Sequence, residues 1–425
     1  MIKLTFFGKE QIVYYEKLDN GLEVFIAPNK MVNSYRVDLV AKFGASIKEF
    51  VPIKEKEYIK MPLGTAHFLE HKMFDTKDGD ATFLFDEAGV VTNASTNYYY
   101  TSYFIEGKNN IKRNLKLFLD VFFTPYFEKD RIENEKGIIG EEIDMYIDDP
   151  DWVLYRIEKA SVFNKALKDE VAGTRETISE INADILEKVY NTFYQPSNTF
   201  IVISGKVNPK EIINIIKNNE SLHQRMSNYP VKFKRVHEEL PVNREYGEGY
   251  GLIVIPKLSY YFKYDVHDFN FVSPEIFKIY LNILFYILFG DGSDFSEKIQ
   301  DEKIANYFYI DTMFYDNIYV IGICGESEYA DIFKNEIDKV LENINTNKED
   351  FEREIKVRKS IIIRELDNIS DISYNIIKSI ITRGKYIDDK EIIDKLNYEE
   401  FLKVISKLSF DNKAFNLLLP KERKS

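Results

Sequence analysis

Apolar and polar residues alternate along much of the first half of the chain, a pattern with a period of two that predicts β-strands. Such stretches lie at 14–29, where Asp19-Asn20-Gly21 would form the turn of a hairpin, and at 34–46 and 90–107. The apolar run at 197–207 predicts a further strand. Helices are expected between these strands, near 64–74, 109–122, 128–147 and 183–193.

The second half of the chain repeats this order of elements. A strand is predicted at 249–257, a helix at 275–290 and a strand pair at 304–325, followed by helices near 329–344 and 348–368. We therefore expect an α+β fold of two tandem homologous domains, each with a mixed or antiparallel sheet and helices packed on one side.

The boundary between these domains is expected where periodicity stops. Residues 223–245 have mixed charge and no regular pattern, which is typical of a linker. This division gives an N-terminal domain at 1–222 and a C-terminal domain at 246–425.

Composition narrows the class of protein. The formal net charge of -13 disfavours a protein that binds the phosphate backbone of nucleic acids. The single cysteine, Cys324, excludes an intrachain disulfide and fits a reducing compartment. The first residues lack the pattern of a secretory signal, and the apolar run 281–290 is too short to span a bilayer. A cytoplasmic location is expected on these grounds.

The stretch "TAHFLEHKM" at 65–73 carries two of the five histidines in the chain, His67 and His71, with Glu70 directly before the second. Positions four apart lie on one face of a helix, so both imidazoles could bind a single Zn²⁺. Glu70 would lie beside that ion and could accept a proton from its water. Two structural histidines on a polar helix face are the alternative, but this spacing of H-x-x-E-H is typical of zinc peptidases.

A third zinc ligand is expected from the predicted helix at 128–147. At 100° per residue, Glu135 and Glu142 fall on the same arc of this helix as a set of apolar residues. Carboxylates on an apolar face are costly unless a cation compensates them, either a metal ion or a Lys or Arg from elsewhere. Glu141 lies at the edge of the arc, so Glu142 is the better candidate ligand and Glu135 would orient the site. The apolar residues of this arc are Ile132, Ile138, Ile139, Met145 and Tyr146.

Five segments together resemble the pitrilysin/insulinase-type inverzincin peptidases, in particular short bacterial members that are similar to mitochondrial processing peptidase. These segments are "GTAHFLEHKMF", "NASTNYYYTSY", "EKGIIGEEIDMYIDDPDW", "AGTRETISEI" and "YQPSNTFIVISGKV". The resemblance is specific from about residue 10 to about residue 210 and rests on element order beyond that.

The resemblance implies a zinc endopeptidase with one Zn²⁺ per chain, bound by His67, His71 and Glu142. It also implies Glu70 as the general base and Glu135 as a supporting glutamate. Such chains form two-chain clam-shells around a chamber.

The family adds peptide substrates as a strand at a sheet edge, and the matching positions are Asn93 and Ala94. An ordinary core strand over 90–106 is the alternative for this segment.

The second half departs from the family pattern. The family has an Arg and a Tyr seven positions apart that contact the substrate, and the matching positions hold Gln300 and Tyr307. The positions that match His67, Glu70 and His71 hold Asn282, Phe285 and Tyr286, so no zinc is expected there. The resemblance implies a dimer, and the departure at Gln300 adds one hypothesis, a heterodimer with a zinc-free homologous subunit that supplies the Arg.

Two other functions remain open at this stage. One is a zinc-free assembly subunit on the same fold, and the other is a peptide-binding chamber with weak hydrolysis. The complete set of His67, Glu70, His71 and Glu142 favours the peptidase over both.

Overall fold

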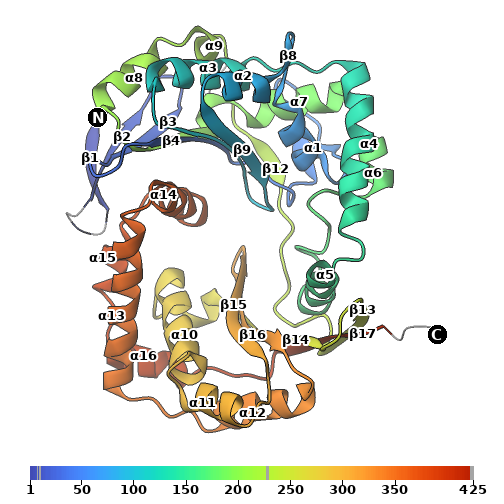
Figure 1. Ribbon diagram of the computed structural model, residues 1–425, viewed down its shortest axis with the longest axis vertical. Coiled ribbons are helices and arrows are strands. Elements are labelled where there is room, and N and C mark those ends of the chain that lie inside the picture. The colour runs from blue at the N-terminus through green and yellow to red at the C-terminus, as the bar shows by residue number, and fades with distance from the viewer. Residues whose placement is uncertain (7, 9–10, 226–228, 422–425) are drawn as a thin grey trace. The chain divides into compact units, whose positions relative to one another are not determined.

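The computed structural model describes residues 1–6, 8, 11–225 and 229–421 (Figure 1). The chain forms two compact units, each assembled from three stretches of sequence. Unit 1 comprises Met1–Ile143, Asp169–Arg235 and Ile361–Glu391. Unit 2 comprises Asp144–Lys168, Val236–Ser360 and Ile392–Ser425.

Unit 1 is built on a mixed sheet of seven strands. Only β3 and β11 run parallel, and every other neighbouring pair in this sheet is antiparallel. In spatial order the strands are β1 (Ile2–Phe6), β2 (Gln11–Lys17), β3 (Glu23–Pro28), β11 (Thr199–Gly205), β4 (Tyr35–Ala41), β10 (Thr101–Gly107) and β9 (Val90–Thr96). Smaller sheets join β12 (Lys232–Lys234), β5 (Glu49–Val51) and β6 (Ile59–Lys60), and β7 (Asp75–Thr76) with β8 (Gly79–Asp80).

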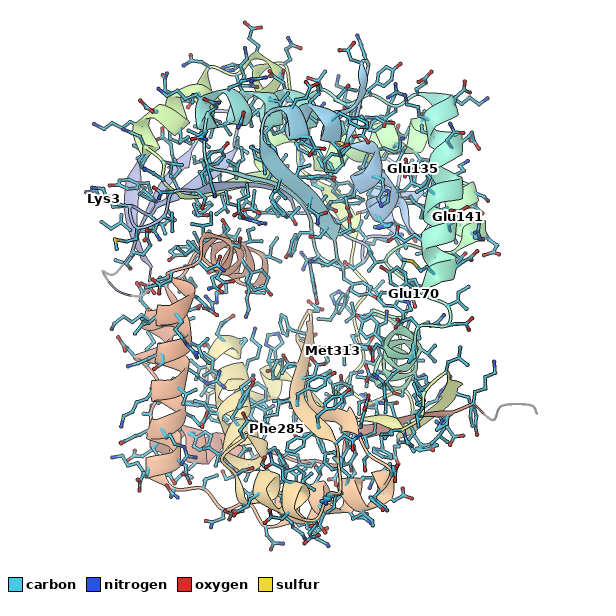
Figure 2. The ribbon with its side chains drawn as sticks, viewed as in Figure 1. Lys3, Glu135, Glu141, Glu170, Phe285 and Met313 are labelled. Atoms are coloured by element: carbon cyan, nitrogen blue, oxygen red, sulfur yellow. The ribbon has the colours of Figure 1, made fainter. Side chains whose placement is uncertain are left out.

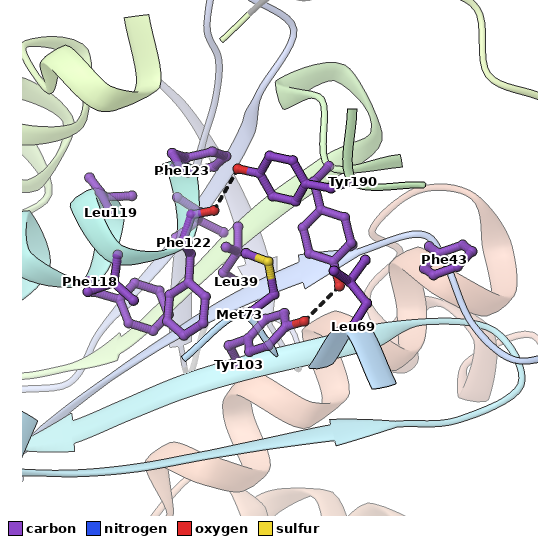
Figure 3. Close-up of a cluster of buried hydrophobic side chains, with 14 of the residues drawn as sticks. Leu39, Phe43, Leu69, Met73, Tyr103, Phe118, Leu119, Phe122, Phe123 and Tyr190 are labelled. Carbon is purple, nitrogen blue, oxygen red and sulfur yellow. Dashed lines mark hydrogen bonds between the residues drawn. The ribbon is translucent and has the colours of Figure 1, made fainter. Parts of the chain in front are cut away.

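The main core of unit 1 lies on one face of this sheet. Alternate residues of β4, such as Val37 and Leu39, belong to this core. Tyrosine hydroxyl groups inside it have hydrogen-bond partners (Figure 3). Tyr190 donates to the Phe122 carbonyl at 2.9 Å, and the hydroxyls of Tyr103 and Tyr194 lie 2.7 Å apart. The helices of unit 1 are α1 (Thr65–Lys72), α2 (Ala81–Glu87), α3 (Ile111–Phe123), most of α4 (Lys129–Met145), α6 (Arg175–Ser179), α7 (Ala183–Phe193), η1 (Pro196–Asn198), α8 (Pro209–Lys217), α9 (Glu220–His223) and α14 (Ile369–Arg383).

Unit 2 is built on a five-stranded sheet whose strand order and directions repeat part of the first. In spatial order its strands are β13 (Tyr246–Gly251), β17 (Lys413–Pro420), β14 (Lys257–Asp265), β16 (Ile318–Glu326) and β15 (Tyr307–Tyr315). The pair β13 and β17 is parallel, like β3 and β11, and the remaining pairs are antiparallel. Its helices are α5 (Pro150–Val162), η2 (Val266–Phe269), α10 (Pro274–Phe289), α11 (Asp294–Asp301), α12 (Ala330–Glu342), most of α13 (Lys348–Glu365) and α16 (Tyr398–Ile405), and α15 (Asp389–Ile393) crosses the division.

Two helices lie on the second face of the sheets. Helix α14 packs on β11 and β4, where Val40 and Phe200 face it, and α5 packs on β13 and β17. In β13, glycines let α5 approach closely, since a Cβ at Gly249 would stand 2.5 Å from Ile157 Cδ1. The α+β class is confirmed, but the prediction of helices on one side only is wrong, because strands such as β11 are buried on both faces.

The exchange of these two helices between halves of the chain was not predicted. Helix α5 comes from the first half and belongs to unit 2, whereas α14 comes from the second half and belongs to unit 1. Within the predicted linker 223–245, β12 pairs with β5 in unit 1, and residues 226–228 lie outside the described residues.

Most predicted elements are confirmed, including the first hairpin, α1, α4, α7, α10 and the pair β15–β16. The strand predicted at 249–257 is wrong, because the chain there leaves β13 at Gly251 and begins β14 at Lys257. No single helix among the described residues is long and apolar enough to cross a membrane. Among the described residues, one pair of helices, α10 and α11, together has the length and composition of a membrane span, but the pair is bent by 41°. Most of α10 is buried in the core of unit 2.

Candidate metal centre

Helix α1 carries the first part of the candidate site. It begins after Gly64, whose φ of +88° suits glycine and whose Cβ, if present, would stand 2.4 Å from the Ala172 carbonyl oxygen. Phe68 and Leu69 insert into the main core of unit 1, in which Figure 3 labels Leu69. Because side chains three and four apart share a face, burial of this pair leaves His67 and His71 together on another side of the helix.

The two imidazoles meet a carboxylate from α4. His67 Nε2 lies 3.7 Å from Glu142 Oε1, and His71 Nε2 lies 3.7 Å from Glu142 Oε2. One ligand atom of each of the three residues lies within 4.8 Å of the others. Within the described residues, this is the one group of His, Cys, Asp and Glu side chains with the spacing of a metal site.

The spacing fits a zinc ion better than hydrogen bonds. At 3.7 Å the nitrogen–oxygen separations exceed those of hydrogen bonds. Zinc bonds nitrogen and carboxylate oxygen at about 2.0–2.2 Å, so two ligand atoms on a tetrahedral ion stand about 3.4 Å apart. Burial lowers the pKa of His67 to about 4, so its imidazole is neutral at neutral pH, as a metal ligand must be.

Glu70 lies on the same helix and is nearly buried, with 8% of its surface exposed. The Thr96 hydroxyl, at the end of β9, donates to Glu70 Oε2 at 2.6 Å. Burial raises the pKa of Glu70, against the opposing effect of that hydrogen bond. Glu70 thus lies next to the histidines but outside the ligand group, with one of its oxygens held by Thr96.

Glu135 (Figure 2) lies about two turns before Glu142 on α4, and its side chain contacts His71 at Nδ1. Its Oε1 is 3.0 Å from His71 Nδ1, and its Oε2 is 3.3 Å from Lys72 Nζ. Because a carboxylate can only accept, Nδ1 of His71 carries a proton, so in the neutral imidazole Nε2 keeps its lone pair. Burial would lower the pKa of His71, but the hydrogen bond to Glu135 and the charges of the neighbouring glutamates outweigh it and raise that pKa. Burial would raise the pKa of Glu135, but the hydrogen bond from His71 and the charge of Lys72 outweigh it and hold that pKa low.

The apolar arc predicted on α4 is only partly correct. Ile132 and Ile139 are buried, and Glu135 and Glu142 lie half-buried on the same side. Ile138 and Met145 are exposed, because they lie at the margin of the arc. Tyr146 is also exposed, because it follows the end of the helix, where the spacing of 100° per residue no longer applies. Glu141 is exposed, in line with its predicted place at the edge.

The predicted substrate positions lie on an edge strand. β9 is the last strand of the seven-stranded sheet, and no described strand pairs with its outer edge. Asn93 is exposed, and the Ala94 N–H donates to the Asn93 side-chain oxygen at 2.8 Å. This edge ends at Thr96, the residue that contacts Glu70.

The remaining predicted positions lie in unit 2. Tyr307 begins β15, is 46% exposed and donates to Glu326 Oε1 at 3.2 Å, and Gln300 lies exposed on α11. The cation beside Tyr307 is Lys257, whose Nζ lies 3.4 Å from the same Glu326 oxygen.

The positions that match the zinc motif lie on α10. There, Phe285 is buried in the apolar core and Tyr286 is exposed, while Asn282 donates to the Tyr319 hydroxyl.

Two residues that contact the site were not found from the sequence. Every second residue of β9 is less exposed than its neighbours, and Thr96 is the last of these residues on a strand that contacts α1. The alternation in the sequence could have indicated that Thr96 faces inward. Lys72 directly follows His71 and is 2% exposed. The sequence could have indicated its burial, because Lys72 lies on a short helix that packs against the core.

Comparisons with known proteins agree with this geometry. The family model described as "Insulinase (Peptidase family M16)" matches residues 54–175. The uncharacterized zinc protease YmfH of Bacillus subtilis (strain 168) is 35% identical over 308 residues, which cover 72% of this chain and 70% of that protein. An uncharacterized zinc protease of Rickettsia bellii (strain RML369-C) is 27% identical over 399 residues, 89% of this chain and 90% of that protein.

Among solved structures, a putative M16-like peptidase from Alicyclobacillus acidocaldarius has the same fold. It superposes with a TM-score of 0.87 at 23% identity and covers 99% of this chain and 100% of that one.

Proposed function

This chain belongs to the insulinase family of peptidases, peptidase family M16, and from that premise we propose that it is a zinc-dependent endopeptidase. The observation that carries the proposal is the convergence of His67, His71 and Glu142, whose ligand atoms lie within 4.8 Å of one another. Two imidazoles and one carboxylate, with a fourth position open, form the ligand set of a catalytic zinc site.

Each residue of the site has a distinct role in this proposal. His67, His71 and Glu142 hold one Zn²⁺, which when bound polarises a peptide carbonyl and lowers the pKa of a water molecule. Glu70 accepts a proton from that water and later donates it to the leaving amine. The hydrogen bond from Thr96 holds one oxygen of Glu70 and leaves the other for both transfers. Glu135 holds His71 in the tautomer whose Nε2 can bind metal.

The substrate is proposed to be an extended peptide that adds to the outer edge of β9. This edge leads directly to Thr96 and Glu70, so a peptide paired along it would pass the candidate metal centre. The exposed bond between the Ala94 N–H and Asn93 can be exchanged for one to a substrate carbonyl. Such pairing recognises the backbone first and so suits leaders or unfolded segments of varied sequence.

A partner subunit is part of the proposal. Gln300 cannot supply a positive charge, so a zinc-free homologous chain could provide an arginine to a chamber formed by two chains. Purification of the chain by itself tests this point. Low activity that rises when such a subunit is added supports the heterodimer, whereas full activity as a homodimer excludes the need for it.

The proposed function is tested by comparing the wild type with Glu70→Gln on quenched-fluorescence peptides, with and without a chelator. We expect the variant to retain zinc and to lose turnover, because the ligands remain while the base is removed. His67→Ala should instead lose the metal. Equal turnover in the wild type and Glu70→Gln would contradict the role of Glu70. Peptide binding without turnover in the zinc-loaded wild type would favour a peptide-binding subunit.

A further inference from the structure

Lys72 is a buried cation directly behind the candidate metal centre. Only 2% of its surface is exposed, although lysine is rarely buried to this degree. Its Nζ lies 3.3 Å from Glu135 Oε2 and 3.4 Å from the Arg131 carbonyl oxygen, and it also pairs with Asp75. The side chain thus runs from α1 to α4, the two helices that provide the candidate zinc ligands.

The two oxygens of Glu135 are divided between His71 and Lys72. Oε1 accepts from His71 Nδ1 at 3.0 Å, while Oε2 faces the ammonium of Lys72. A carboxylate held at one oxygen only can rotate about its last torsion, which is a broad one. With both oxygens held, the acceptor for His71 stays at a fixed place, and the imidazole plane is fixed with it.

We propose that Lys72 is a positioning residue for the zinc ligand His71 and acts through Glu135. This inference rests on the proposed function, since it concerns the same metal centre. The chain of contacts runs from Asp75 to Lys72, from Lys72 to Glu135, and from Glu135 to the Nδ1 of His71. The groups behind a metal-bound histidine commonly change metal affinity by about 10–100-fold when they are removed.

The alternative role of Lys72 is purely structural, as a buried ion pair between two helices. The chain offers a matched control for it. Lys263 in unit 2 is 1% exposed and pairs with Glu238 at 2.8 Å, and neither residue belongs to the group of candidate ligands. Removal of either lysine leaves a carboxylate that is at least half-buried without its ammonium, but only Lys72 contacts a residue that contacts a candidate ligand.

The test compares Lys72→Met, Lys72→Arg and Lys263→Met with the wild type. Cobalt replaces zinc as the probe, because its visible absorption reports ligand geometry without any need for turnover. Affinity is measured by competition with a chromophoric chelator, and each variant is measured below its own unfolding midpoint. Glu135→Gln and the double variant Lys72→Met/Glu135→Gln show whether the effect passes through Glu135.

We expect Lys72→Met to bind cobalt about 10–100-fold more weakly than the wild type and to show an altered absorption spectrum. Lys72→Arg should recover most of the affinity, and Lys263→Met should keep the wild-type affinity and spectrum even if it unfolds earlier. The double variant should bind about as weakly as Glu135→Gln. If Lys72→Met does not fold, Lys72→Arg is compared with Glu135→Gln instead. Lys72→Arg should then keep the wild-type spectrum and most of the affinity, whereas Glu135→Gln should bind more weakly and show an altered spectrum.

Three results would overturn the inference. A wild-type spectrum and affinity in Lys72→Met, together with a loss of stability like that of Lys263→Met, would leave only the structural role. Additive losses in the double variant would show that Lys72 does not act through Glu135. A wild type that binds no cobalt or zinc would instead remove the proposed function, and the role of Lys72 with it.

Discussion

Replacement of Glu238 by glutamine should destabilise unit 2 strongly. The carboxylate has no exposed side-chain surface and accepts four hydrogen bonds. Three come from the backbone N–H groups of Asn164, Lys165 and Ala166, at 2.6, 3.0 and 2.7 Å, and the fourth comes from Lys263 at 2.8 Å. Glu238 therefore anchors the segment that follows α5 to β14.

The magnitude follows from what glutamine cannot do. Each carboxylate oxygen accepts two of the four bonds, so an amide nitrogen at either position meets two donors. Lys263 keeps the carbonyl oxygens of Val162 and Pro241 but loses its counter-charge. Breaking a buried ion pair by removing one partner costs about 3–5 kcal/mol. For a unit of this size that corresponds to a fall of about 6–20 °C in Tm.

The assay uses the single tryptophan, Trp152, which lies on α5 in unit 2. Urea unfolding followed by its fluorescence reports this unit. Glu352→Gln is the control within the same unit, since its ion pair with Lys348 is exposed and should contribute no more than about 1 kcal/mol. Glu238→Gln/Lys263→Met should recover part of the loss, because no buried charge remains. A loss below about 1 kcal/mol in Glu238→Gln, or a loss equal to that of the control, would refute this account.

Three further predictions concern other parts of the chain. Burial raises the pKa of Glu158 to about 7 in the folded protein, whereas a glutamate in an unfolded chain has a pKa of about 4.3. The stability that its protonation contributes is therefore fully present below about pH 4.3 and is lost as the pH rises through 7. Unfolding followed by Trp152 fluorescence should show the wild type losing up to about 3 kcal/mol between pH 4 and pH 8, a loss absent from Glu158→Gln. Gly64→Ala should lower Tm and metal content together, because the residue has a φ of +88° and no room for a Cβ at the start of α1. Unchanged values would show that the start of α1 tolerates a side chain. Ala94→Pro should raise KM about tenfold with normal zinc content, because it removes one edge N–H from β9. An unchanged KM would argue against strand addition at this position.

Local patterns predicted the two helices that carry the candidate ligands. The spacing of His67 and His71 places both on one face of a helix whatever the rest of the fold, and the spacing of seven between Glu135 and Glu142 does the same on α4. The meeting of the two helices was inferred because buried carboxylates need a cation, and because the family resemblance places Glu142 in one ligand set with the histidines. The structure replaces that general argument with the distances from Glu142 to both histidines.

The contacts that the sequence did not reveal are long-range ones. The α14 segment has an apolar face, but nothing in its pattern says that it covers the sheet of the first half rather than its own. Glu238 lies in a stretch without periodicity, and its role depends on Lys263 and three backbone groups from another segment. Lys72 is similar, since its partner Glu135 lies 63 residues away.

Anomalous diffraction at the zinc edge, from crystals of the zinc-loaded protein, tests the central claim most directly. We expect one peak per chain, at about 2.0–2.2 Å from His67 Nε2, His71 Nε2 and a Glu142 oxygen, with Glu70 outside the coordination sphere. A peak at another place, a ligand set that omits Glu142, or direct coordination by Glu70 would contradict the account.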